Sequence, residues 1–209
     1  MNNIDWVAAA VGFGILMISL TIHEAAHAWT ADRLGDPTAR ILGRVSLNPA
    51  RHIDPIGTLL LPLIAALTRL PLIGWAKPVP VDTRRLRNPR RDFMIIAAAG
   101  PISNLLQAIV AALAFRALGG DYPLPSSVWE YALLVAVDVN LLLAFFNMIP
   151  VPPLDGGNVV LGLLPPRLAG HYEQVRQYGF IILYVLMLSG AATRLIVPPS
   201  DFLMRILVQ

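Results

Sequence analysis

Two histidines and one glutamate within five residues have the types and the spacing for metal-dependent chemistry. They stand in the stretch TIHEAAHAWT, residues 21–30, as His23, Glu24 and His27. If the stretch is helical, residues four apart share one face, so the two imidazoles can bind one ion. Glu24 projects beside them, where its carboxylate can accept a proton from water. The arrangement is the H-E-x-x-H pattern of zinc-dependent peptidases, although so short a motif also occurs by chance.

A third ligand has to come from elsewhere in the chain, because a catalytic zinc site generally has three protein ligands and one open position. The chain has no cysteine, so histidine, aspartate and glutamate are the available types. The other two histidines, His52 and His171, fall in predicted loops. Asp155 is the better candidate, since it stands in NMIPVPPLDGGN, residues 147–158. The prolines before it block regular helix and the glycines after it allow close backbone approach, so the chain can turn the carboxylate inward.

These residues belong to a chain whose composition is typical of a polytopic membrane protein. Of its 209 residues, 56% are hydrophobic and 14% are charged, whereas about one quarter of an average soluble domain is charged. Four apolar runs are long enough to cross a hydrocarbon core, which takes about 20 helical residues. They are roughly 4–31, 93–115, 129–149 and 178–197. The predicted fold is all-α, a single membrane-embedded domain over residues 1–209 whose additional C-terminal transmembrane helix is the fourth run.

The first run places ionisable residues within a predicted membrane span. Ile4 and His23 are nineteen residues apart, or about 28 Å of helix at about 1.5 Å per residue, so His23 is expected near the inner boundary of the hydrocarbon core. Ionisable side chains in such segments are costly and usually functional, which favours a metal site over two incidental histidines. The N-terminal residues lack the basic region and cleavage site of a signal peptide, so this span is expected to be retained.

A fifth apolar segment, 55–74, is predicted to re-enter the membrane without crossing it. Three prolines and Arg69 interrupt it, and since proline breaks helices, a hairpin is on this ground as plausible as a span. Basic residues precede it and follow it, and lysine and arginine tend to stay on the cytoplasmic side. Crossing would separate the two basic groups. The resulting topology is a multi-pass protein of the cell membrane with its N-terminus outside and its metal site near the cytoplasmic face.

Two stretches on the predicted inner side could be extended. Residues 39–48 and 74–82 alternate apolar and polar residues or carry prolines two apart, as edge strands do. They form either a small β element or a pair of irregular loops, and the pattern does not decide between the two. The basic cluster RRLRNPRRD, 84–92, would suit nucleic acid only outside a membrane. Anchoring to anionic lipid headgroups is the simpler interpretation, so no nucleic-acid partner is expected.

Together, these motifs resemble those of the site-2 protease family of intramembrane zinc metallopeptidases. The resemblance rests on His23-Glu24-Ala25-Ala26-His27, on Asn147-x-x-Pro150 with Leu154-Asp155-Gly156, and on AAAGPISN at 97–104, which is similar to the family's Gly-Pro-x-x-Asn stretch. It covers about residues 15–160. Each motif is weak alone, but three of them in this order on membrane segments form a specific signal.

The resemblance implies a role for each candidate site residue. His23, His27 and Asp155 would hold one catalytic zinc ion, and Glu24 would be the general base. Asn147 would lie near the scissile bond, where its amide could stabilise an oxyanion. The family's core has three spans, which match the first three here, and a re-entrant β element between the first two. The chain lacks the PDZ-like and nucleotide-sensing domains of larger members, so the resemblance does not extend to gating or to partners.

We therefore expect a zinc metalloendopeptidase that cleaves transmembrane proteins or peptides within or near the lipid bilayer, with its core at about 4–160. Two alternatives are an inactive relative that only binds membrane proteins and a metal-binding transporter. Glu24 argues against both, because neither needs a base between two zinc histidines. Asp138, Asn140 and Asn104 are interpreted as polar contacts between helices, with a functional role for Asp138 and Asn140, and orientation of the site by Asn104, as the alternatives. No observation on the sequence bears on the oligomeric state.

Overall fold

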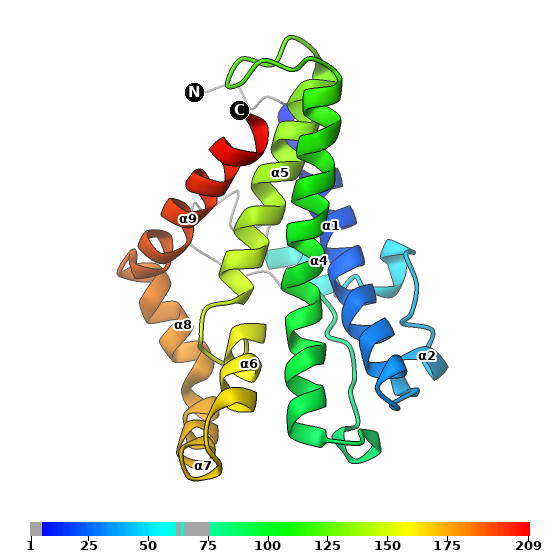
Figure 1. Cartoon of the computed structure of the whole chain (residues 1–209), viewed down its shortest axis with the longest axis vertical. Coiled ribbons are helices and arrows are strands. Elements are labelled where there is room, and N and C mark those ends of the chain that lie inside the picture. Colours follow the sequence, from blue (N-terminus) through cyan, green and yellow to red (C-terminus); the bar gives the residue numbers. More distant parts are fainter. Residues whose placement is uncertain (1–5, 62–63, 65–75) are drawn as a thin grey trace.

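Three long helices form the body of the protein, as the first three apolar runs predict. The computed structural model describes residues 6–61, 64 and 76–209. Helix α1 spans Trp6–Arg33, α4 spans Pro89–Ala117 and α5 spans Val128–Asn147. Each is long and apolar enough to cross a membrane, and the three run along the long axis of the molecule (Figure 1). The predicted all-α polytopic fold class is confirmed.

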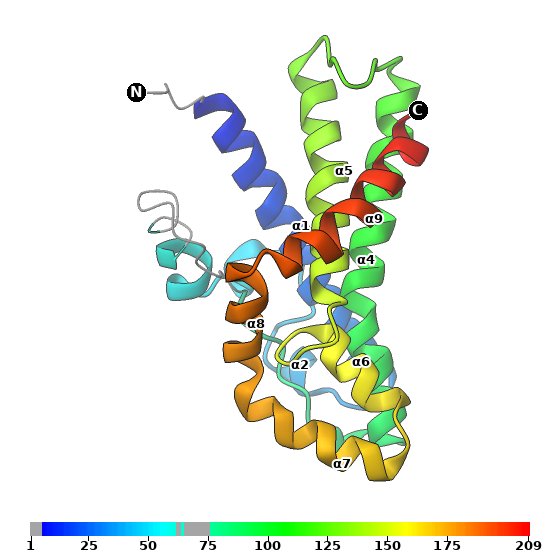
Figure 2. The same ribbon diagram turned by 90° about the vertical axis from the view of Figure 1, so that its left-hand side faces the viewer.

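Helix α4 is the central element, because it packs against both other long helices and against α6, Asp155–Leu163. Ala108, Ala111 and Ala112 form its buried face towards α5, and small side chains of this kind let membrane helices approach closely. The buried residues of α1 all lie between Ser19 and Ala31. Accordingly, the N-terminal turns of α1 diverge from α5 (Figure 2), and α1 joins the bundle through the half that carries the histidines.

Local side-chain contacts set where the second and third long helices begin. Helix α4 starts with Pro89 after Asn88, and the carboxylate of Asp92 accepts the Asn88 N–H at 2.8 Å. Helix α5 starts after Ser127, whose hydroxyl accepts the Glu130 N–H at 3.2 Å, while the Glu130 carboxylate accepts the N–H of the preceding serine at 2.8 Å. This reciprocal arrangement satisfies amide groups that a helix start leaves without partners.

The apolar run predicted as an additional C-terminal transmembrane helix at 178–197 is bent in the structure, and whether it spans the membrane stays a prediction. Helix α7, Pro166–Val175, and a short turn lead into α8, Gly179–Leu188, and the chain then bends by 71° into α9, Ala191–Val208. The break lies at Gly190, whose φ of 74° is left-handed and ends a helix. Helix α9 crosses α5 obliquely (Figure 2). The uninterrupted apolar composition concealed the break because glycine is compatible with an apolar run.

The edge strands that the sequence left as one of two alternatives do not form in the part of the chain that the structure describes. The stretch 39–48 begins inside a short helix, α2, Thr38–Ile41, and continues as turns. Residues 76–82 are extended but belong to no strand. Lys77 donates its N–H to the His52 carbonyl at 2.9 Å, and a strand needs a partner along its whole length rather than at one residue. The alternative of irregular loops therefore describes these stretches.

The segment 55–74 is described only at its beginning. Pro55–Leu60 forms a short helical turn whose first amides are capped by Asp54, which accepts the N–H groups of Ile56 and Gly57 at 3.0 and 2.7 Å. Most of the remainder, residues 62–63 and 65–74, lies outside the described residues. The prediction that the segment re-enters the membrane stays a prediction.

Candidate metal centre

Helix α1 brings His23, Glu24 and His27 into the interior of the protein. They are 4%, 9% and 8% exposed. The two histidines are one helical turn apart, and their Nε2 atoms approach to 3.0 Å. The structure therefore confirms the prediction that the two histidines lie on one face of the helix.

The Nδ1 atom of each histidine, on the other side of the ring from Nε2, faces an oxygen acceptor on α4. The Nδ1 of His23 lies 2.6 Å from Oδ1 of Asn104, and the Nδ1 of His27 lies 2.7 Å from the carbonyl oxygen of Ile96. An oxygen acceptor requires a proton on the nitrogen that faces it, so each Nδ1 donates and each neutral ring has its lone pair on Nε2. Two lone pairs 3.0 Å apart repel each other unless a cation lies between them.

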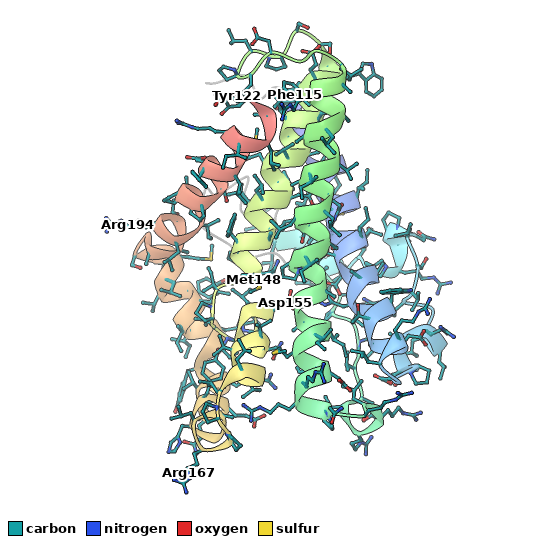
Figure 3. All side chains as sticks on the ribbon, viewed as in Figure 1. Phe115, Tyr122, Met148, Asp155, Arg167 and Arg194 are labelled. Carbon is teal, nitrogen blue, oxygen red and sulfur yellow. The ribbon has the colours of Figure 1, made fainter. Side chains whose placement is uncertain are left out.

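Asp155 reaches the histidine pair from the start of α6. Its Oδ2 lies 3.2 Å from Nε2 of His23 and 3.4 Å from Nε2 of His27. The same oxygen is buried and has no hydrogen-bond partner within the described residues. Figure 3 places Asp155 at mid-height of the molecule, beside Met148 at the end of α5. The aspartate chosen from the sequence thus meets the histidines in space.

The chain can deliver Asp155 there because two glycines follow it. A Cβ on Gly156 would lie 2.3 Å from the carbonyl oxygen of Met148, and one on Gly157 would lie 2.7 Å from the backbone nitrogen of Pro152. A side chain at Gly156 would push α6 away from the end of α5, and one at Gly157 would clash with the loop that precedes α6. The interpretation of the glycines as sites of close backbone approach is met in the structure.

The three atoms that face one another have the spacing of zinc ligands. The distances between the two Nε2 atoms and Oδ2 are 3.0, 3.2 and 3.4 Å. Ligands about 2.0–2.2 Å from a tetrahedral zinc ion lie about 3.3 Å from one another. Two neutral imidazoles and one carboxylate with an unpaired buried oxygen are also a suitable donor set for a divalent metal. The residues present fit a zinc ion.

Gly100 of α4 lets the imidazole rings of both histidines lie against the helix backbone. A Cβ at this position would lie 2.4 Å from Nε2 of His27 and 2.5 Å from both Nε2 and Cε1 of His23. A methyl group would overlap the two rings, so any side chain here would displace the candidate ligands. The sequence motif Gly-Pro-x-x-Asn drew attention to this stretch, but no pattern indicated that its glycine lies against the histidines.

A cavity of about 530 Å³ opens onto the three ligand atoms. Glu24 and Asn147 line it together with His23, His27 and Asp155, so all five predicted site residues meet in one place. The rest of the wall is largely apolar. It includes Leu20, Phe93, Ile96, Leu143, Phe146 and Phe180. Phe180, from α8, was not anticipated from the sequence, since nothing in an apolar run distinguishes a residue that lines a cavity from one that faces lipid.

The extended residues after the undescribed segment form one side of the same cavity. Ala76, Pro78, Val79 and Val81 line it. Arg44 holds this stretch in place, because its guanidinium donates to the carbonyl of Lys77. Arg44 is 5% exposed, which is unusual for an arginine, and a single basic residue in a loop offers no sequence signal for such a role.

The remaining candidates lie away from the ligand atoms. His52 bonds through Nε2 to the carbonyl of Ser46 at 2.8 Å, and the exposed His171 bonds through Nδ1 to the carbonyl of Arg167 at 2.9 Å. Asn140 connects helices, as the sequence suggested, since its amide bonds to Asn104 and to Ser19.

Known proteins share most of this chain. Residues 121–190 match the model of "Peptidase family M50". The chain is 36% identical to "Putative zinc metalloprotease YwhC" of Bacillus subtilis, over 88% of this chain and 82% of that protein. It is 33% identical to Rip2 of Mycolicibacterium smegmatis, which carries the same description, over 90% of this chain and 75% of that protein. No solved structure matches the chain.

Proposed function

This chain belongs to peptidase family M50, the site-2 protease family, and is a metalloprotease; from that premise we propose that it hydrolyses peptide bonds of membrane proteins within or near the bilayer. The observation that supports the proposal most is the position of the cavity. It brings Glu24 together with three residues that suit a zinc ion, and two of those three lie on a helix long and apolar enough to span a membrane.

The zinc ion would be held by His23, His27 and Asp155. When bound, it would polarise the scissile carbonyl and make a water molecule acidic enough to lose a proton near neutral pH. Glu24 takes that proton as the water oxygen forms its bond to the carbonyl carbon. Glu24 then gives the proton to the nitrogen as the carbon–nitrogen bond breaks, so the products are a carboxylate-bearing fragment and an amine.

Asn147 is the candidate for stabilising the oxyanion. It lies at the C-terminal end of α5 and lines the cavity, and its amide nitrogen donates to the Leu143 carbonyl one turn earlier at 3.0 Å. A rotation about the side-chain bonds would turn this donor towards the cavity, where negative charge develops on the carbonyl oxygen. Leu143 loses little, because its carbonyl is also the acceptor of a helical hydrogen bond.

The apolar wall and the extended stretch 76–81 suit a substrate segment that has lost its helical hydrogen bonds. A transmembrane helix shields its own carbonyl groups, so it must unwind before any of them reaches the ligand atoms. Backbone groups of an extended segment can pair with such an unwound strand. We therefore propose that transmembrane proteins or peptides are the substrates, and that the lipid bilayer is the other partner.

The proposal includes an orientation in the cell membrane. The N-terminus lies outside, and the loop between α1 and α4, which carries half of the basic residues, lies in the cytoplasm. The metal ligands of α1 are in its C-terminal half, so the cavity opens near the cytoplasmic face, where water is available.

The decisive experiment compares the wild type with Glu24→Gln after reconstitution in liposomes with a panel of single-span substrates. Zinc content is measured in both. We expect one zinc ion per chain in each protein and cleavage by the wild type alone. Glu24→Gln keeps the shape of the side chain but cannot take the proton. Persistent cleavage by Glu24→Gln, or a zinc-loaded wild type that cleaves no substrate in the panel, would contradict the proposal.

A further inference from the structure

A buried chain of hydrogen bonds connects the metal ligand His23 to the other two long helices. Asn104 of α4 accepts from Nδ1 of His23 at 2.6 Å and donates to Oδ1 of Asn140 of α5 at 2.8 Å. Asn140 then donates to the hydroxyl of Ser19 at 2.9 Å and to the carbonyl of Ala136 at 2.9 Å. Ser19 lies on α1 one turn before His23, so the contacts close a ring through all three helices.

The carbonyl of Ala136 sets the direction of every hydrogen bond in this chain. A backbone carbonyl only accepts, so the amide nitrogen of Asn140 must face it and the Asn140 oxygen must face Asn104. The Asn140 oxygen accepts a hydrogen bond, so the group of Asn104 that faces it must be the amide nitrogen. The oxygen of Asn104 therefore faces His23. Since this oxygen accepts, Nδ1 of His23 carries the proton and Nε2 presents a lone pair to the other ligands.

Burial makes the reverse arrangement unfavourable. Asn104 is fully buried, Asn140 and Ser19 are each 2% exposed, and His23 is 4% exposed. Water is therefore not available to replace a missing partner, and a flipped amide would leave two donors, or two acceptors, facing each other. The only low-energy arrangement is the one in which Nδ1 of His23 carries the proton and Nε2 presents its lone pair.

The two histidines are oriented in different ways. His27 donates to the backbone carbonyl of Ile96, which no side-chain substitution removes. His23 depends on a side chain, and that side chain depends on Asn140. The orientation of the first ligand is thus sensitive to residues that touch neither the metal position nor the cavity, since neither Asn104 nor Asn140 lines it.

We propose that Asn104 is a positioning residue of the metal centre, which fixes the tautomer and the ring orientation of His23 and is itself aligned by Asn140. The inference rests on the proposed zinc site. Partners of this kind on metal-bound histidines typically change metal affinity by about 10- to 100-fold when they are removed. Asn104 and Asn140 therefore do more than hold helices together.

The test compares three variants of the full chain in detergent. Asn104→Ala removes the acceptor, and Asn104→Asp keeps an oxygen that accepts from His23. Gln107→Ala is the matched control, because Gln107 lies one turn further along α4 and its buried amide nitrogen has no hydrogen-bond partner in the described structure. The readouts are zinc affinity by competition with a chromophoric chelator, the visible spectrum of the cobalt-loaded protein, and thermal unfolding of the metal-free protein.

We expect zinc binding by Asn104→Ala to weaken about 10- to 100-fold, with an altered cobalt spectrum. Asn104→Asp keeps the acceptor for His23 but loses the donor to Asn140, so its loss should be smaller, and Gln107→Ala should stay within a few-fold of the wild type. A purely structural role would instead lower the unfolding temperature of the metal-free protein and leave zinc affinity unchanged, which would overturn the inference. An equal loss in Asn104→Asp would overturn it as well.

Asn140→Ala keeps the inference testable if Asn104→Ala does not fold. This variant leaves the His23 contact in place but removes the group that aligns Asn104, so we expect weaker zinc binding here too. An unchanged zinc affinity would show that Asn140 does not align Asn104. A wild type that binds no zinc at all would contradict the proposed function instead. A zinc-binding wild type with an unaffected Asn104→Ala would contradict only the positioning role.

Discussion

Gly100 faces His27 so closely that a Cβ on the glycine would lie 2.4 Å from Nε2 of the histidine. The two residues come from different helices, α4 and α1, and the glycine lets the imidazole rings of both histidines approach the backbone of α4. A glycine within a helix is destabilising by about 1 kcal/mol relative to alanine. Its presence here is explained by the close approach of the two rings.

Gly100→Ala is expected to abolish zinc binding while the helices remain intact. The added methyl group would displace the imidazole rings of both candidate ligands, and alanine favours a helix more than glycine does. Zinc content and affinity of the purified protein give the measurement. Gly14→Ala is the matched control, since a Cβ there meets nothing within 4 Å. Normal zinc stoichiometry in Gly100→Ala would show that the ion does not lie between these ligands.

Removal of zinc is expected to lower the thermal stability of the wild type. A ligand at about 1,000 times its dissociation constant stabilises the folded state by about 4 kcal/mol, so a strong chelator should reduce the unfolding temperature by several degrees. Asp155→Ala should unfold at a lower temperature than the zinc-loaded wild type and should not respond to the chelator. A chelator-sensitive Asp155→Ala would remove Asp155 from the ligand set.

Asn147→Ala is expected to slow cleavage about 100- to 1,000-fold, which is the usual loss when one oxyanion donor is removed. Zinc affinity should not change, because Asn147 is not one of the three ligands. The measurement is kcat on a reconstituted substrate, with zinc content as the control. A cleavage rate close to that of the wild type would show that Asn147 does not stabilise the oxyanion. Its role would then be limited to the hydrogen bond with the Leu143 carbonyl at the end of α5.

Single cysteines test the orientation, since the chain contains none of its own. Arg85→Cys lies in the basic loop before α4, and Leu124→Cys lies in the loop between α4 and α5, where Leu124 is 75% exposed. In intact cells, a membrane-impermeant thiol reagent should label Leu124→Cys and spare Arg85→Cys. A permeant reagent should label both. The opposite result with the impermeant reagent would place the metal site near the outer face.

Ser127→Ala is expected to destabilise the protein by about 1 kcal/mol, because the hydroxyl caps the start of α5 by accepting the Glu130 N–H. The unfolding temperature should fall by a few degrees while cleavage is retained, since this loop lies at the opposite end of α5 from Asn147. Ser127→Asp keeps a capping oxygen and should restore most of the stability. Equal losses in both variants would point to a different role for Ser127.

The positions of the helices and of the ligands were predictable to different extents. The three long helices follow from apolar runs, which depend on composition alone. The bend at Gly190 was missed because one glycine within such a run does not reveal whether its φ is positive. The choice between strands and irregular loops at 39–48 and 74–82 stayed open in the sequence, because alternation describes one stretch and not its partner.

Local patterns determined the class of the protein, its three principal helices and the pairing of His23 and His27 as candidate metal ligands with Glu24 beside them. Helical spacing and apolar length act over a few turns, so a short stretch of sequence is enough to reveal them. Asp155 was identified because prolines and glycines mark a turn, but its meeting with the histidines required the packing of α6 against α4. Gly100 and Asn104 acquired their meaning only in the tertiary structure. Their contacts with the histidines depend on the distance and rotation between α1 and α4, which are set by side chains distributed along both helices.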